Sequence, residues 1–173
     1  GNTDGDSLAQ LQEYQILSNP NDDDSDDDTV NDDIESADGS DPNLVDSDSD
    51  GLDDGEEKAA GSSPTLHDTD ADGLGDAFEV SNSLDPTDNG SINVANGADG
   101  DPDSDSLSNL EEQTRGTDPR DDDSDDDDLR DGEEVNIFGT NPTNSDSDGD
   151  NIPDGEETIA GTDGFKTNPL SAD

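Results

Sequence analysis

The sequence predicts an irregular array of short repeats, with little regular secondary structure and no conventional hydrophobic core. Three observations predict this class. A twelve-residue acidic pattern, clearest as D-S-D-S-D-G-L-D-D-G-E-E at residues 46–57, occurs seven times. The copies begin 22, 22, 22, 33, 22 and 23 residues apart, which is typical of tandem units that pack on their neighbours. Only 21% of the 173 residues are hydrophobic, so an ordinary core cannot be built.

The formal charge of −48 would normally predict disorder, because so little apolar surface cannot offset chain entropy. The absence of cysteine excludes disulfides and thiolate metal sites. Five basic residues are too few to bind nucleic acid, and no apolar run approaches the ~20 residues of a membrane span. Since the chain has neither an initiator Met nor a signal peptide, we expect a processed or excised piece.

The twelve-residue pattern places oxygen-bearing side chains at positions one, three and five and a Glu at position twelve, which is the ligand pattern of a calcium loop. Hard, oxygen-preferring cations fit these ligands, calcium before magnesium or manganese. The chain is therefore predicted to be a metal-stabilised array, with bound calcium in place of a core. We expect at least seven ions, and more because several acids lie outside the ligand sets: Asp22, Asp23, Asp33, Asp88, Asp99, Asp122 and Asp173.

The predicted side-chain ligands, repeat by repeat, are Asn2, Asp4, Asp6 and Glu13; Asp24, Asp26, Asp28, Asp32 and Glu35; Asp46, Asp48, Asp50, Asp54 and Glu57; Asp68, Asp70, Asp72, Asp76 and Glu79; Asp101, Asp103, Asp105 and Glu112; Asp123, Asp125, Asp127, Asp131 and Glu134; and Asp146, Asp148, Asp150, Asp154 and Glu157. Position seven is always apolar and is predicted to donate its backbone carbonyl to the ion while its side chain turns inward: Leu8, Val30, Leu52, Leu74, Leu107, Leu129 and Ile152.

Two features distinguish the repeats. The first loop begins with neutral Asn2 and has Gln10 at position nine, so we expect weaker binding there. Position six needs a sharp turn, which Gly favours and which β-branched Thr29 of the second loop disfavours.

Position nine is Asp in five repeats, and its role is open. The carboxylate binds the same ion through water, or reaches a second ion shared with the adjacent repeat. Alternatively, it is an acid favoured at a helix start by the helix dipole. The Glu at position eleven is expected to face solvent.

After each loop, about one helical turn is expected, as at residues 54–60 and 131–137. Gly-Ser/Thr-Asp/Asn-Pro then ends it, because Gly adopts positive φ and Pro prevents continuation. The predicted organisation is four repeats in residues 1–86, an insertion at 87–100 and three repeats in 101–173. Ile92 and Val94 alternate within the insertion, which favours a short edge strand or an unstructured linker.

The string D-x-D-x-D-G-L-x-D-G-E-E followed by G-T-D/N-P resembles the bacterial thrombospondin type 3 repeat. The resemblance covers nearly the whole chain except residues 87–100 and 164–173. It implies secreted or cell-surface, calcium-dependent modules in which the chain wraps around a row of ions. Animal members carry cysteines that are missing here, so a prokaryotic source is expected. Dockerins and EF-hands are excluded, because they need longer helices.

The two ends also match. Residues 98–107 and the joined sequence 172–173 plus 1–8 are identical at seven of ten positions. We expect either a longer tandem array or head-to-tail self-association into a filament. The predicted function is an extracellular, calcium-rigidified structural stalk, spacer or filament. The alternatives are an adhesin segment at the cell surface or an acidic calcium store that nucleates mineral. With one His, no Cys and no phosphate-binding loop, no enzyme activity is expected.

Overall fold

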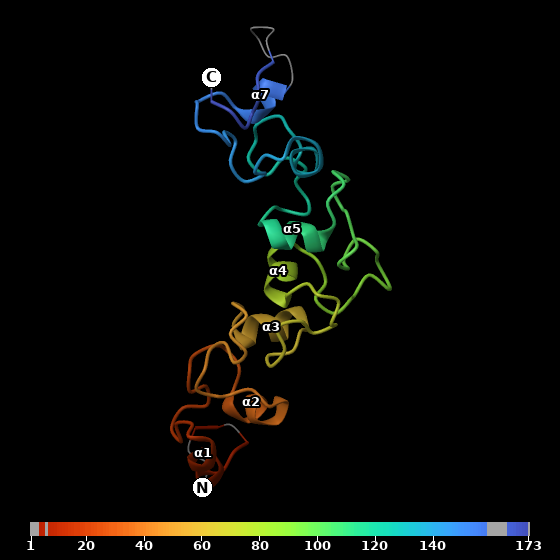
Figure 1. The fold of residues 1–173 in the computed structure, drawn as a ribbon. Helices are drawn as coiled ribbons and strands as arrows, with labels where there is room; N and C mark the ends of the chain where they lie inside the picture. The colour runs from red at the N-terminus through yellow and green to blue at the C-terminus, as the bar shows by residue number, and fades with distance from the viewer. Residues whose placement is uncertain (1–3, 6, 159–165, 173) are drawn as a thin grey trace. The chain divides into compact units, whose positions relative to one another are not determined.

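A computed structural model describes residues 4–5, 7–158 and 166–172. The predicted ligands Asn2 and Asp6 lie outside these residues. The chain forms two compact units, residues 1–89 and 90–173. The first contains the helices α1 (Gln10–Ile16), α2 (Asp32–Asp38), α3 (Asp54–Ala60) and α4 (Asp76–Ser81) (Figure 1). The second contains α5 (Asn109–Arg115), α6 (Asp131–Glu133), the π-helix η1 (Glu134–Phe138) and α7 (Asp154–Thr158).

The described residues contain no strand, so the irregular class predicted from the sequence is confirmed at that level. The prediction of an edge strand at Ile92 and Val94 was wrong. This segment turns on itself through hydrogen bonds from the backbone N–H of Asn96 to Asn93 O (2.9 Å) and of Gly100 to Gly97 O (2.8 Å). Because the bonds are local, no neighbouring strand is available, and both aliphatic side chains remain exposed.

The second to seventh repeats are each closed by one backbone hydrogen bond that brackets the loop. The N–H at position nine donates to the carbonyl just before position one, as from Asp54 to Val45 (2.8 Å) and from Asp131 to Asp122 (3.1 Å). Position nine then starts the short helix. In four repeats the helix ends at a left-handed Gly, and the N–H of that Gly bonds the carbonyl of the position-twelve Glu, as at Gly61 and Glu57 (2.7 Å). The predicted helix stop is therefore observed.

The apolar side chains at position seven are the main hydrophobic contribution to the interior. Six of them, Leu8, Val30, Leu52, Leu74, Leu107 and Leu129, are buried, whereas Ile152 is half-buried. Their exposed fractions of 0–8% show that the inward orientation predicted from the loop pattern is right for these six. Seven small side chains spread over the repeats cannot hold the chain together alone, because each contributes only about 1.5–3 kcal/mol on burial.

Position six has left-handed backbone even where Gly is missing. The φ angle is 84° at Thr29, 87° at Ser106 and 77° at Asn151, close to the 107° of Gly51. The β-branched side chain of Thr29 therefore does not prevent the loop from forming. A second left-handed residue, which the sequence did not reveal, stands at position four, for example Ser49 (φ 65°) and Ala71 (φ 62°).

Neighbouring repeats meet at the residue in position ten. The N–H of Gly132 donates to Asp105 Oδ2 (2.6 Å), and that of Gly155 donates to Asp127 Oδ2 (2.9 Å), so each bond joins a helix start to the loop of the preceding repeat. A Cβ atom at Gly132 would lie 2.1 Å from the carbonyl oxygen of Asp105. Glycine is required because only a residue without a side chain permits this approach.

Replacing Gly132 by Ala should therefore separate the fifth and sixth repeats. We expect the folded protein to lose about 1–3 kcal/mol, the usual cost of overpacking. Thermal unfolding of the cation-loaded protein measures this, with Glu133→Ala, an exposed neighbour, as the matched control. Equal melting temperatures for the two variants would contradict the proposed contact.

Candidate metal centres

The acidic side chains at positions one, three and five of each loop fold back on their own backbone. In the third repeat, Asp46 accepts hydrogen bonds from the N–H groups of Ser49 (2.7 Å) and Gly51 (3.2 Å). Asp48 accepts from Asp50 N (3.1 Å), and Asp50 accepts from Leu52 N (2.8 Å). These bonds shape the turn and hold the carboxylates on its inner side. They also explain why Asp stands at alternate positions, since each carboxylate reaches an N–H two to five residues further on.

Several carboxylates at positions three and five then have a second oxygen to spare, whereas those of Asp105 and Asp127 use it for the next repeat. In the third repeat, the Oδ2 atoms of Asp48 and Asp50 are buried and accept no hydrogen bond, and the same holds for Asp26 and Asp70 in their loops. Carboxylate oxygens of positions one, three and five converge to within 4.8 Å of one another in four loops. These loops begin at Asp24, Asp46, Asp68 and Asp101.

The position-twelve glutamates are among the most deeply buried acids in the described part of the chain. Glu13, Glu35, Glu57, Glu79, Glu112, Glu134 and Glu157 are 0–1% exposed. Neither side-chain oxygen of Glu35, Glu57, Glu79 or Glu112 has a hydrogen-bond partner. Buried polar groups in proteins are normally bonded, and a buried charge without a partner is expensive. These four glutamates, in the same state at the same position, could therefore hold a cation.

The electrostatics support this interpretation. Burial, together with repulsion by nearby aspartates, raises the pKa of Glu35, Glu57, Glu112 and Glu134 to about 8 and that of Glu79 to about 9. For Glu57, the repelling groups include Asp48 and Asp50 of its own loop. Positions three, five and twelve thus act on one another as a single cluster, as the sequence pattern predicted. We call positions one, three, five and twelve of one repeat the loop cluster.

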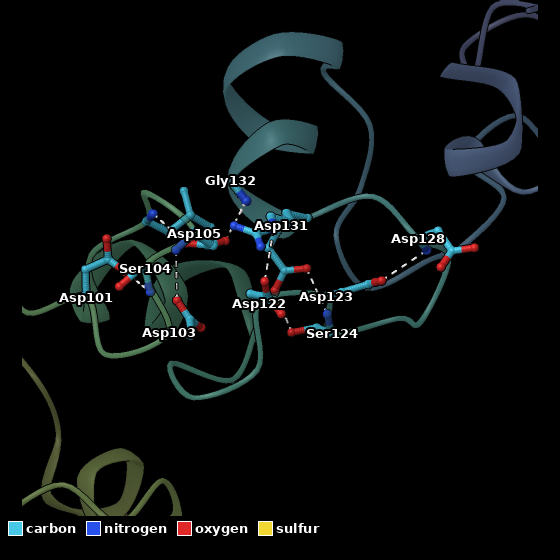
Figure 2. A network of polar contacts seen from close by, with 12 residues as sticks. Asp101, Asp103, Ser104, Asp105, Asp122, Asp123, Ser124, Asp128, Asp131 and Gly132 are labelled. Carbon is cyan, nitrogen blue, oxygen red and sulfur yellow. Dashed lines mark hydrogen bonds and ion pairs between the residues drawn. The ribbon is translucent and has the colours of Figure 1, made fainter. Parts of the chain in front are cut away.

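A second kind of cluster joins successive repeats. Oxygens of Asp28 and Glu35 of the second repeat and of Asp54 of the third repeat lie within 4.8 Å of one another, and all three residues are buried. We call this set, positions five and twelve of one repeat with position nine of the next, the junction cluster. At the junction between the fifth and sixth repeats, in the second unit, the same positions are occupied by Asp105, Glu112 and Asp131. The carboxylate of Asp131 repels both of the other two. Figure 2 shows Asp105 and Asp131 at this junction.

The junction cluster bears on the role of position nine. The aspartates at this position start the helices and are 0–1% exposed: Asp32, Asp54, Asp76, Asp131 and Asp154. In the third repeat, the carboxylate of Asp54 lies beside the acids of the preceding repeat. The Glu side chains at position eleven, Glu56, Glu111, Glu133 and Glu156, are exposed, as expected.

Several acids outside the ligand sets have partners in the protein. Asp33 accepts two hydrogen bonds from Ser7, at its N–H (3.1 Å) and its hydroxyl (2.5 Å). Asp122 forms an ion pair with Arg130 (3.0 Å). These two residues therefore do not argue for additional cations. Lys58 pairs with Asp38 on the surface in the same way.

The contacts that Ser and Thr residues make near the clusters were not predicted from the sequence. Thr167 donates its hydroxyl to Glu157 Oε1 (2.8 Å) and its N–H to Glu157 O (3.1 Å), so residues 166–172 close the seventh repeat. Ser18 and Thr117, which precede Asn-Pro and Asp-Pro, donate their N–H groups to Glu13 O and Glu112 O. The recurrence of Ser or Thr before these dipeptides was the available signal, but it was interpreted only as a helix stop.

Comparisons with known proteins give little further guidance. No model of a known protein family matches the chain, and no curated protein matches it. Two solved structures are similar to parts of it. The B domain of a biofilm associated protein is 31% identical over 30% of this chain and 11% of that chain, with a TM-score of 0.25. The BSP domain of a biofilm associated protein is 38% identical over 28% of this chain and 8% of that chain, also with a TM-score of 0.25. The chain thus spans about a tenth of the length of these solved chains.

The raised glutamate pKa values predict an unusual pH dependence for the metal-free protein. The folded pKa of about 8 exceeds the ordinary value of 4.5, so the folded state holds protons that the unfolded state releases. Stability in chelator should therefore be fully present below pH 4.5 and should be lost as the pH rises towards 8. Circular dichroism in chelator at a series of pH values measures the loss of order.

The matched control compares two sets of substitutions. Gln at the position-twelve glutamates should flatten this pH dependence, because Gln carries no proton to release. Gln at the four exposed position-eleven glutamates should leave it unchanged. A chelated wild-type chain equally ordered at pH 5 and pH 8 would refute the assignment.

Proposed function

We propose that this chain is a calcium-binding structural repeat protein, in which bound cations replace a hydrophobic core. The single observation that carries the proposal is the set of buried position-twelve glutamates whose oxygens have no hydrogen-bond partner, at Glu35, Glu57, Glu79 and Glu112. The main groups that repel these glutamates are aspartates, and at neutral pH a bound cation would compensate the charge in place of a proton.

The donor set favours calcium. All ligands are oxygens, several carboxylates meet at one point, and the loop carries flexible alternate aspartates with a fixed Glu. Calcium accepts six to eight such oxygens, whereas magnesium requires a stricter octahedron and retains water. Each loop cluster would hold one ion through positions one, three, five and twelve. Each junction cluster would hold a further ion, which makes the total larger than seven.

Two unit charges about 4 Å apart repel by about 4 kcal/mol at an effective dielectric constant of about 20. A junction cluster of three carboxylates within 4.8 Å therefore opposes folding strongly until a cation binds. The ion reverses the sign of these interactions and ties two repeats together. The array should consequently be stiff in calcium and loose without it. This is the behaviour expected of a spacer, stalk or filament.

The proposed setting is outside a prokaryotic cell. Extracellular calcium modules bind with dissociation constants of about 10⁻⁴–10⁻³ M, which matches calcium outside cells and exceeds its cytosolic level. None of the described helices is long and apolar enough to cross a membrane. The resemblance to thrombospondin type 3 repeats agrees with this setting. We further propose that repeats continue head to tail, either in a longer tandem array or in a filament. We also propose that the chain has no enzymatic activity.

An adhesin segment is the second candidate function. The insertion exposes two aliphatic side chains, Ile92 (88% exposed) and Val94 (72% exposed), which favours a contact surface. Replacing both by Ser should reduce the adhesion of protein-coated beads and leave calcium-dependent folding intact if this candidate is right.

The third candidate, a calcium store, predicts calcium uptake without cooperative folding.

Calcium removal tests the structural function directly. Circular dichroism should show ordered structure in millimolar calcium, and this order should be lost in chelator at pH 7.5 and restored cooperatively on calcium addition. Magnesium at the same concentration should restore less. Identical spectra in calcium and in chelator would overturn the proposal.

One glutamate pair gives a sharper test. Glu57→Gln removes a charge from the third loop cluster and from the junction with the fourth repeat, so at least one calcium ion should be lost. Glu56→Gln removes the same charge from the exposed neighbour and should lose none. Counting bound ions by native mass spectrometry distinguishes the two. Equal ion counts in the variants would mean that Glu57 is not a ligand.

A further inference from the structure

Position two of the loop carries a hydroxyl that lies between two other groups. In the third repeat, Ser47 donates its N–H to Asp54 Oδ1 (2.8 Å), and its Oγ lies 2.8 Å from Asp54 Oδ2. The same Oγ lies 2.8 Å from the backbone nitrogen of Asp41, the residue before Pro42. Ser47 therefore connects the turn that leaves α2 to the carboxylate at position nine.

The direction of the hydrogen bonds is determined by the chemistry of the partners. The backbone N–H of Asp41 only donates, so Ser47 Oγ accepts from it. An ionised carboxylate only accepts, so the Ser47 hydroxyl hydrogen points at Asp54. Each oxygen of Asp54 thus receives one hydrogen bond from Ser47. Asp54 itself is 1% exposed and lies within 4.8 Å of Asp28 and Glu35, so its remaining acceptor capacity belongs to the junction cluster.

The same arrangement recurs along the chain. Ser25 bonds Asp32 (2.8 and 2.9 Å) and accepts from Asn19 N (2.7 Å). Thr69 bonds Asp76 (2.8 and 2.7 Å) and accepts from Ser63 N (2.8 Å). Ser124 bonds Asp131 (2.9 and 2.6 Å) and accepts from Asp118 N (3.2 Å), and Figure 2 shows the Ser124–Asp131 contact.

The fifth repeat provides an internal comparison. Its position two is Pro102, which has neither an N–H nor a hydroxyl to donate. Its position nine is Asn109, an amide in place of the acid. The amide nitrogen donates to Ala95 O and Gly97 O (both 2.9 Å), carbonyls of the insertion. In the fifth repeat, therefore, the hydroxyl at position two and the carboxylate at position nine are both absent.

We infer that the hydroxyl at position two is a positioning residue for the cation at the junction between repeats, a role that rests on the function proposed above. It holds the position-nine carboxylate with its free lone pairs towards Asp28 and Glu35. Partners of this kind typically change metal affinity by about 10–100-fold.

The test uses Ser47→Ala in the complete chain. Native mass spectrometry at a series of free calcium concentrations should show that one ion per molecule binds about 10–100-fold more weakly, while the other ions are retained. Ser47→Thr should bind as the wild type does, because Thr69 has this role in the fourth repeat. Ser49→Ala is the matched control, since Ala71 occupies position four of the fourth loop with nearly the same φ.

A double-mutant comparison separates positioning from a general structural effect. Asp54→Asn should weaken the same ion, and adding Ser47→Ala to it should have no further effect. Thr69→Val, which conserves the side-chain shape, repeats the test at another junction if Ser47→Ala does not fold. Two results would overturn the inference and leave the proposed function intact. One is that Ser47→Ala binds every ion as tightly as the wild type does. The other is that the effects of Ser47→Ala and Asp54→Asn on ion affinity are additive. A wild-type chain that binds no divalent cation would instead overturn the proposed function.

Discussion

Mutual repulsion between buried carboxylates is the interaction on which the rest of this structure depends. Asp28, Glu35 and Asp54 come from two repeats and bring their oxygens within 4.8 Å of one another without a basic neighbour. An ordinary protein avoids such a cluster, because each unpaired buried charge is expensive. Here the same cluster type recurs from repeat to repeat. Under the proposed function, the fold near neutral pH depends on a compensating cation.

That condition explains features that would otherwise weaken a protein. The helices have seven residues or fewer, short of the ~12–15 needed for marginal stability alone. The loops contain two left-handed residues each, often Ser, Asp or Thr, which cost conformational energy. The apolar interior consists mainly of one aliphatic side chain per repeat. Cation coordination could supply the missing stabilisation, and it would make folding responsive to the calcium concentration.

Hydrogen bonds from the surrounding groups orient the acids. In the third repeat, one oxygen each of Asp48 and Asp50 holds the loop backbone, and the other is buried without a hydrogen bond. The hydroxyl at position two holds the position-nine acid, and Gly at position ten allows the neighbouring loop to approach. The fifth repeat differs at all three positions, with Pro102, Asn109 and Leu110, and its Asn109 bonds the insertion instead. At the start of the second unit, hydrogen bonds from the Asn109 amide to two backbone carbonyls therefore stand where the other repeats have an acid at position nine.

The sequence by itself determined the parts of this protein that are local. The register of Glu at position twelve, the alternate acids, the inward apolar residue and the helix stop at Gly all follow from interactions within one twelve-residue loop and the turn after it. The tertiary structure decided what position nine does, because its partners, such as Asp28 and Glu35 for Asp54, lie in the preceding repeat. It also decided the left-handed backbone at position four, the hydroxyl contacts and the turns of the insertion. The position-nine contacts join neighbouring repeats, and the hydroxyl contacts join residues six or seven apart, such as Asp41 and Ser47. The backbone at position four and the turns of the insertion rest on bonds between residues three apart, which the ligand pattern does not encode.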